Sequence, residues 1–128
     1  MVVAPTTRIL GPGGTVHELA LMEGMLLAIE ESAQAQGFQR VRGVVLEVGC
    51  FAGVDPEALR FAFEVVTGGT VAEGACLTLE EPLGTGWCAA CNQGLPVRSR
   101  LDPCPLCEGF PLRVTGGTEL RLKALDVD

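Results

Sequence analysis

Two pairs of cysteines form the clearest chemical pattern in the sequence. Cys88 and Cys91 are separated by two residues, as are Cys104 and Cys107, and twelve residues lie between the pairs. A C-x2-C unit places two thiolates at one tight turn, and two such turns supply the four ligands of a tetrahedral Zn²⁺ site. Four thiolates leave no open position for water, so we expect a closed, structural site. A redox disulfide and an iron centre remain alternatives for the same thiols.

The charge balance argues against a nucleic-acid partner. Nine basic and sixteen acidic residues give a net charge of −7, which repels a phosphate backbone. Three arginines lie near the cysteines, but Asp102, Glu108 and the negative charge of a four-thiolate zinc centre offset them. We therefore interpret these arginines as solvated surface charge.

Length and hydropathy predict a cytoplasmic protein without a membrane span. The longest apolar runs, such as residues 25–29, are far shorter than the about 20 residues that cross a bilayer. The first fifteen residues lack the layout of a secretory signal. Cysteines in such a compartment are metal ligands or reduced thiols, and we expect Cys50 and Cys76, outside both pairs, to be buried free thiols.

His17 is the only histidine in the chain, and tyrosine is absent. Groups for general acid–base catalysis are therefore few, and we expect no enzyme activity. A zinc-protease helix would need a second histidine at position 21, which is Leu21. Residues 15–18 also fit a capping box, with Thr15 as the N-cap and Glu18 reaching back. From the residues alone, a helix cap is favoured over a metal role for His17.

Helix signals occur twice in the first two thirds of the chain. Apolar residues recur at steps of three and four between positions 19 and 33, which predicts an amphipathic helix ended by Gly37. Asp55 as N-cap and Pro56 in the first turn predict a second helix, which ends at Gly68-Gly69. Strands are predicted by their β-branched or alternating patterns at residues 41–48, 75–80 and 120–127.

These elements predict an α+β fold, with two helices packed on a small mixed sheet of about three strands and an inserted zinc-ribbon-like module. The lead-in is rich in glycine and proline and is expected to be flexible. The expected division is a flexible N-terminal extension at 1–15, an α+β domain at 16–81 and 118–128, and a zinc-binding module at 82–117.

Several motifs, in order, resemble the HypA family of nickel metallochaperones, which act in the maturation of [NiFe]-hydrogenase. The motifs are His17 to Gly24, Val45 to Gly49, Gly53 to Glu64 and the two cysteine pairs, and the similarity runs from residue 16 to the end. The resemblance implies a nickel-binding α+β domain and a zinc domain.

By the same resemblance, His17 matches the family's nickel-binding histidine, and Glu18 matches its neighbour, which contributes through its backbone. The four paired cysteines match the zinc ligands. Zn²⁺ is then a structural cofactor and Ni²⁺ the transferred cargo. The implied partners are a HypB-type GTPase and the [NiFe]-hydrogenase large-subunit precursor, with urease as a further possible client.

The chain departs from the family pattern at its start. Family members begin Met-His-Glu, whereas fifteen residues here precede Val16. With them present, the nitrogen of Val16 is a peptide amide, and nickel affinity is expected to fall. One hypothesis is that Val16 marks the true start, from a GTG codon, and the intact mass of the native protein tests this.

Overall fold

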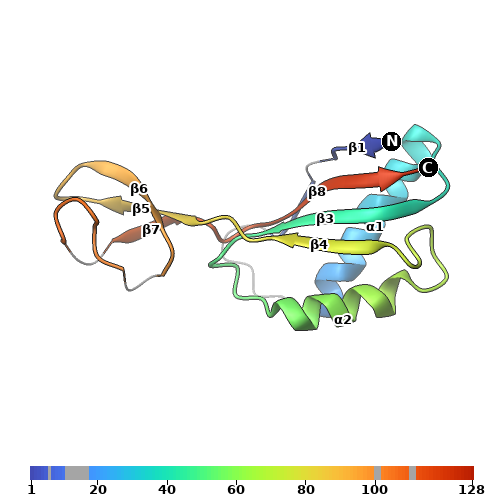
Figure 1. The fold of residues 1–128 in the computed structure, drawn as a ribbon, viewed down its shortest axis with the longest axis horizontal. Helices are drawn as coiled ribbons and strands as arrows, with labels where there is room; N and C mark the ends of the chain where they lie inside the picture. The colour runs from blue at the N-terminus through green and yellow to red at the C-terminus, as the bar shows by residue number, and fades with distance from the viewer. Residues whose placement is uncertain (6, 11–17, 100–101, 110–111) are drawn as a thin grey trace.

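The computed structural model describes residues 1–5, 7–10, 18–99, 102–109 and 112–128. The molecule is elongated, with a helix-covered sheet at one end and a small three-stranded sheet at the other (Figure 1). The larger body contains β1 (Val2–Val3), β2 (Thr7–Leu10), α1 (Glu18–Gln36), β3 (Val41–Val48), α2 (Pro56–Thr67), β4 (Cys76–Glu80) and β8 (Leu120–Val127). The smaller body contains β5 (Gly84–Cys88), β6 (Gln93–Val97) and β7 (Arg113–Gly116).

The sheet of the larger body is mixed, as the sequence predicts. Its strand order is β1-β8-β3-β4, with β2 also paired to β8. The β3 and β4 strands are parallel, and α2 connects them, whereas β8 runs antiparallel to β3. The predicted strands at 41–48 and 120–127 have the observed bounds, and the one predicted at 75–80 begins one residue later.

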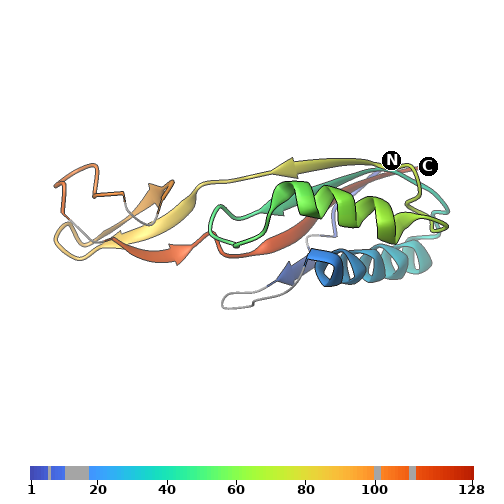
Figure 2. The ribbon, with the colours of Figure 1, turned by 90° about the horizontal axis from the view of Figure 1, so that it is seen from below.

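Both helices cover one face of this sheet and pack against each other (Figure 2). The α1 helix ends before Gly37, whose φ of 77° is a conformation that glycine adopts without cost. The N-cap of α2 is Asp55, whose carboxylate accepts a hydrogen bond from the Glu57 backbone N–H at 3.0 Å. No helix in the described ranges is long and apolar enough to cross a membrane.

The core between helices and sheet is mainly aliphatic. Alternate residues of β3 and β8 face the helices, and a bulge in β8 keeps its apolar residues on that face. The largest fully buried side chains are Met22, Met25, Ile29, Val41, Val44, Leu46, Leu59, Leu120, Leu122, Leu125 and Val127.

The N-terminal extension differs from the flexible lead-in that the sequence predicts. Residues 2–3 and 7–10 form β1 and β2, both antiparallel to β8. The cause is tertiary: without them, β8 would be an edge strand with one row of unpaired backbone groups. Val3 also belongs to the core, with only 7% of its surface exposed. Residues 11–15, the last five of the predicted extension, lie outside the described residues.

The smaller body is a three-stranded antiparallel sheet with β5 at its centre. The first cysteine pair lies at the turn between β5 and β6, at the tip of the hairpin that these two strands form. Val97 and Leu112 are buried with Cys88 and Cys104 in a small apolar cluster. The module is thus built around the cysteines.

Glycines join the two bodies closely. The Gly49 N–H donates to the Glu119 carbonyl at 2.9 Å, and a Cβ on Gly49 would lie 2.2 Å from the Gly117 oxygen. Gly117 has a φ of 100°, and its own Cβ would lie 2.6 Å from the Cα of Gly84. Only glycine fits these positions, so the joint is set by backbone packing.

The two unpaired cysteines correct an expectation, because both are exposed instead of buried. Cys50 follows β3 at the joint, where its Sγ accepts a hydrogen bond from the Gly84 N–H at 3.1 Å. Cys76 begins β4 and alternates with Leu77 and Leu79, which pack against the core, so Cys76 lies on the solvent face of the sheet. The apolar residues around Cys50 and Cys76 in the sequence therefore did not indicate that these two thiols are exposed.

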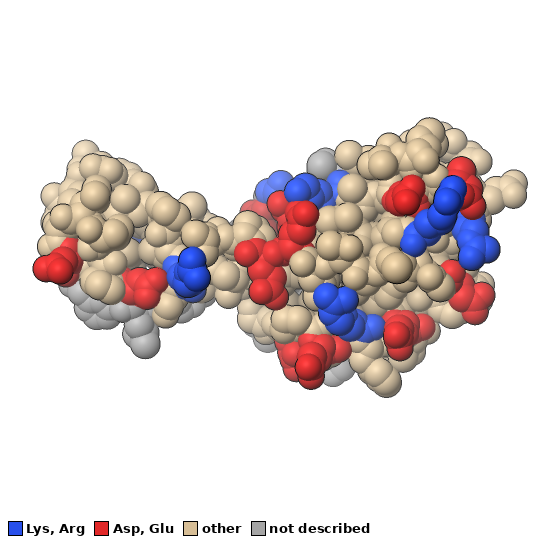
Figure 3. Space-filling view, viewed as in Figure 1, with Lys and Arg blue, Asp and Glu red and all other residues tan. Residues whose placement is uncertain are grey.

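Acidic and basic side chains are interspersed over the larger body on the face shown in Figure 3. Lys123 of β8 reaches across β3, with its Nζ 2.7 Å from Glu80 and 3.9 Å from Glu47. The hydrogen bond to Glu80 and the charge of that carboxylate raise the pKa of Lys123. These exposed pairs link three adjacent strands across the solvent face.

Candidate metal centre

The structure brings the four paired cysteines together. Their Sγ atoms all lie within 4.8 Å of one another. The distance is 3.6 Å between the sulfurs of Cys88 and Cys107, and 3.9 Å between those of Cys91 and Cys104. In the described parts of the chain, this is the one group of histidine, cysteine and acidic side chains close enough to hold a metal ion.

Each cysteine pair is held by the same kind of turn. The Asn92 N–H donates to the Cys88 carbonyl at 2.8 Å, and the Glu108 N–H donates to the Cys104 carbonyl at 2.8 Å. Asn92 and Glu108, each four residues after the first cysteine, have positive φ values of 56° and 58°. In both turns, the residue that follows the second cysteine is therefore in the left-handed conformation. Asparagine tolerates this conformation better than most residues.

Backbone N–H groups also point at the sulfurs of the second pair. The Leu106 N–H lies 3.4 Å from the Cys104 Sγ, and the Gly109 N–H lies 3.3 Å from the Cys107 Sγ. Such donors favour the thiolate over the thiol. This turn is thus preorganised for anionic sulfur, which is the form that binds metals.

The crowded thiols have divergent pKa values. Burial acts to raise the pKa of Cys104, but the backbone N–H groups of Cys107 and Leu106 and the neighbouring thiols outweigh it and lower the pKa to about 7. The hydrogen bond with Cys107, followed by burial, raises the pKa of Cys91 to about 12. A bound cation would stabilise all four sulfurs as thiolates, so that none of them would need to keep its proton.

The geometry and chemistry of the donors fit Zn²⁺. A tetrahedral centre with Zn–S bonds of about 2.3 Å has Sγ–Sγ distances of about 3.8 Å. The two observed distances of 3.6 and 3.9 Å bracket this value. Cys88 and Cys104 are buried, whereas Cys107 is exposed, so the centre lies at the surface of the small body. Four thiolates would hold the ion without a free coordination position.

The residues expected to bind nickel are described only in part. His17, with Thr15 and Val16, lies outside the described residues. Glu18 is the first residue of α1, and its carboxylate accepts a hydrogen bond from the Asp55 N–H at 3.4 Å. This contact joins the start of α1 to the start of α2. No sequence signal indicated it, because the two residues are far apart in the chain.

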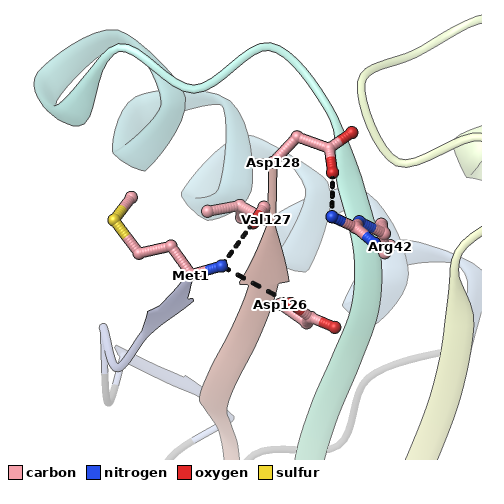
Figure 4. A network of polar contacts seen from close by, with 5 residues as sticks. All are labelled: Met1, Arg42, Asp126, Val127 and Asp128. Carbon is pink, nitrogen blue, oxygen red and sulfur yellow. Dashed lines mark hydrogen bonds and ion pairs between the residues drawn. The ribbon is translucent and has the colours of Figure 1, made fainter.

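The terminal amine of the chain lies at the other end of the larger body. The Met1 ammonium donates to the Val127 carbonyl at 2.8 Å and lies 3.9 Å from Asp126 (Figure 4). Val127 is opposite Val41, which follows the C-terminal end of α1. The nineteen residues of α1 span about 28 Å, and Glu18 begins this helix. The Met1 amine and Glu18 therefore do not share a site.

A two-helix α+β body joined to a small body with four clustered thiols defines a two-part protein with a metal-binding module. Comparison with known families agrees with this class. Residues 16–127 match the family model described as "Hydrogenase/urease nickel incorporation, metallochaperone, hypA". The chain belongs to the HypA family.

Full-length relatives support the assignment. The chain is 46% identical over 113 residues to "Hydrogenase maturation factor HypA 2" of Bradyrhizobium diazoefficiens, covering 88% of this chain and 100% of that protein. It is 50% identical over 112 residues to "Hydrogenase maturation factor HypA" of Azorhizobium caulinodans, covering 88% of this chain and 99% of that protein. Because the family model begins at residue 16, β1 and β2 lie outside the family match.

Two solved structures share the fold. The solution structure of the Ni metallochaperone HypA from Helicobacter pylori aligns with a TM-score of 0.65 and 22% identity, covering 88% of this chain and 97% of that one. Another, "Solution structure of HypA protein", aligns with a TM-score of 0.66 and 24% identity, covering 90% and 98%. The predicted α+β fold with its inserted metal module is confirmed.

Proposed function

We propose that the protein is a cytoplasmic nickel metallochaperone that binds Ni²⁺ through His17 and delivers it for [NiFe]-hydrogenase maturation, with no catalysis of its own. The carrying observation is the family match over residues 16–127, which begins at the His17-Glu18 motif and includes the clustered cysteines. The maturation-factor relatives that the chain spans almost in full support hydrogenase as the client.

The four cysteines would hold Zn²⁺ as a structural cofactor. When bound, the ion would supply charge compensation and a covalent-like crosslink between the β5–β6 turn and the segment before β7. Its ligand shell would be complete, so the site takes no part in nickel transfer by ligand exchange. The chain's own contribution is to orient the four thiolates.

Nickel is the cargo, and its proposed ligands are the His17 imidazole and neighbouring backbone nitrogens, including that of Glu18. Imidazole and deprotonated amide nitrogens suit a square-planar Ni²⁺. In the full chain, the Met1 amine is held at Val127, so only internal nitrogens accompany His17. A chain that begins with methionine in place of Val16 would add a terminal amine next to His17, and we expect it to bind Ni²⁺ more tightly.

Calorimetric Ni²⁺ titrations of the zinc-loaded full chain and of the chain beginning at position 16 test this ligand set. The short chain is expected to bind at least about tenfold more tightly, the equivalent of about 1.4 kcal/mol. Equal affinities would show that a terminal amine is not a ligand. The zinc content of both proteins is measured in parallel, so that a difference in nickel affinity is not caused by a difference in bound zinc.

The proposed partners are a HypB-type GTPase and the large-subunit precursor of [NiFe]-hydrogenase. The alternative function is a non-catalytic zinc-ribbon interaction module, in which His17 only caps α1. Both predict a four-thiolate zinc site, but only the first predicts transfer of nickel. The family description also names urease, so urease apoprotein is the second client to compare.

A transfer assay separates these functions. The nickel-loaded protein is mixed with the GTPase and the hydrogenase precursor, and the nickel recovered with the precursor is measured by mass spectrometry. We expect transfer by the wild type and loss of transfer with His17→Ala. The control is Glu30→Ala, an exposed position of α1, which should transfer normally. If the wild type transfers nickel neither to the hydrogenase precursor nor to urease apoprotein, the zinc-ribbon interaction module is the better explanation of the protein's function.

A further inference from the structure

The β8 strand pairs with β3 along one edge and with the chain's own N-terminal residues along the other. The Val127 N–H donates to the Met1 carbonyl at 2.7 Å. The Met1 ammonium donates to the Val127 carbonyl at 2.8 Å, as Figure 4 shows. The family match begins at residue 16, so β1 and β2 are an addition to the matched region. Without them, this edge would present backbone groups that accept an extended segment by main-chain pairing.

The pairing of the N-terminal segment with β8 is short and interrupted. The β1 strand has two residues and β2 has four, whereas β3 on the other edge of β8 has eight. Pro5 lies between β1 and β2 and has no N–H to donate. Within β2, the register shifts between Arg8 and Leu10. A continuous strand as long as β8 would therefore form more main-chain hydrogen bonds at this edge than the N-terminal segment does.

Few side chains hold the N-terminal segment in place. Among the side chains described for residues 1–5 and 9, Val3 alone is buried, and Ile9 packs against the core while partly exposed. Met1 and Val2 are 67% and 72% exposed. The segment thus fills an apolar position beside β8 but has little further burial. A strand that pairs along the whole of β8 could displace it.

We propose that residues 1–10 are a displaceable strap, which covers a docking edge of β8 for an extended segment of a partner protein. The partner segment would contain no proline and would present apolar residues at the places of Val3 and Ile9. It would also carry a cationic group at the place of the Met1 ammonium, which lies 3.9 Å from Asp126. The partner pairs with β8 only when the strap leaves, so the strap weakens its binding. This inference does not rest on nickel binding.

Binding of a synthetic peptide tests this docking edge. The probe has the sequence of residues 1–10 with Pro5→Val and carries fluorescein at its C-terminus, so that fluorescence anisotropy reports its affinity. The full chain is compared with a short chain that begins with methionine in place of Val16. The short chain contains the whole family match, which makes up nearly the full length of relatives, so it is expected to fold.

We expect the short chain to bind the probe at least about tenfold more tightly than the full chain, because the strap leaves the edge open in only a fraction of full-length molecules. Equal affinities would place the peptide on another surface and would overturn the proposal. So would a short chain that binds no peptide with its helical circular dichroism intact. If sedimentation velocity shows that the short chain associates with itself and thereby excludes the peptide, the occupant is a second copy and the proposal is wrong.

Variants of the probe test the chemistry of the partner segment. Val3→Asn in the peptide places an amide against the apolar core and should weaken binding to the short chain by at least about tenfold. Val2→Asn is the matched control, because this side chain is 72% exposed in the full chain, and it should bind as the probe does. Acetylation removes the ammonium beside Asp126 and should also weaken binding. A peptide indifferent to Val3→Asn and to acetylation would contradict the proposed pairing.

The same substitutions in the full chain test displacement without truncation. Val3→Asn should release the strap, so the affinity for the probe should rise towards that of the short chain. Val2→Asn should leave it at the level of the full chain. Limited proteolysis follows the release of residues 1–10, and helical circular dichroism shows that the rest of the chain stays folded. Release of the strap without a gain in peptide affinity would show that the strap does not cover a docking edge.

Discussion

Met1 and Val127 exchange two hydrogen bonds, so the first residue of the chain is fixed to the penultimate one. Figure 4 shows the bond that the Met1 ammonium donates. The pair joins β1 to β8 at the end of the sheet where α1 ends. Asp126 and the ion pair between Arg42 and Asp128 lie beside it. The extension is therefore part of the folded larger body, and its contribution to stability can be measured.

Val3 and Val2 give a matched pair for this measurement. Val3 is 7% exposed and Val2 is 72% exposed, although they are adjacent in β1. Val3→Ala should lower the free energy of unfolding by about 1–2 kcal/mol, because two buried methyl groups are lost. Val2→Ala should change it by less than about 0.5 kcal/mol. Urea denaturation measures both, and equal effects would mean that β1 does not dock as described.

The glycine joint predicts a large difference between two substitutions near β3. A Cβ on Gly49 would lie 2.2 Å from the Gly117 oxygen, whereas one on Gly43 would meet Asp126 at an ordinary 3.5 Å. Gly49→Ala should cost about 1–3 kcal/mol through overpacking. Gly43→Ala should stay within about 0.5 kcal/mol. Thermal unfolding compares them, and a tolerated Gly49→Ala would show that the two bodies are not joined by close backbone contact.

Removal of zinc should unfold the small body selectively. Trp87, the only tryptophan of the chain, is in β5 next to Cys88 and reports on that body alone. With a chelator, or in Cys104→Ser, we expect its fluorescence to shift to the red while helical circular dichroism persists, because both helices belong to the other body. Cys76→Ser, outside the centre, is the control and should retain its zinc. Simultaneous loss of both signals would show that the bodies unfold as one.

The thiol pKa values predict how zinc affinity depends on pH. Without metal, Cys91 keeps its proton at neutral pH because its pKa is about 12, whereas Cys104 loses its proton near pH 7. Zinc binding displaces the remaining protons, so affinity rises with pH. Below pH 7, zinc binding must also displace the proton of Cys104. The slope of the logarithm of zinc affinity against pH should therefore be steeper by about one below pH 7 than above it.

Competition with a chromogenic chelator at a series of pH values measures this slope. Cys50→Ser provides the control, since its sulfur lies outside the centre. A slope that is the same on both sides of pH 7 would contradict the lowered pKa of Cys104.

Local signals predicted much of the fold. Asp55 and Gly37 mark helix ends through their own side-chain and backbone chemistry, and the structure confirms both. The strands at 41–48 and 120–127 are long enough for their patterns to be distinctive. Close approach of the four cysteines also follows from two turn-forming pairs at a spacing typical of zinc modules.

Tertiary features could not be predicted in the same way. The short β1 and β2 strands depend on the free edge of β8, which no local pattern reveals. The exposure of Cys76 follows from its place on the solvent face of β4, and that of Cys50 from its position at the joint between the bodies. The nickel ligands are inferred from the family resemblance, because a single histidine beside a helix start also fits a cap.

The most direct test of the central claim is a calorimetric Ni²⁺ titration of the zinc-loaded wild type and His17→Ala. The account predicts one Ni²⁺ per wild-type chain and an affinity lower by at least about tenfold in the variant, or about 1.4 kcal/mol. The zinc content should be equal, since the four-thiolate centre lies in the other body. Unchanged nickel affinity in His17→Ala would contradict the account and favour a helix cap in an interaction module.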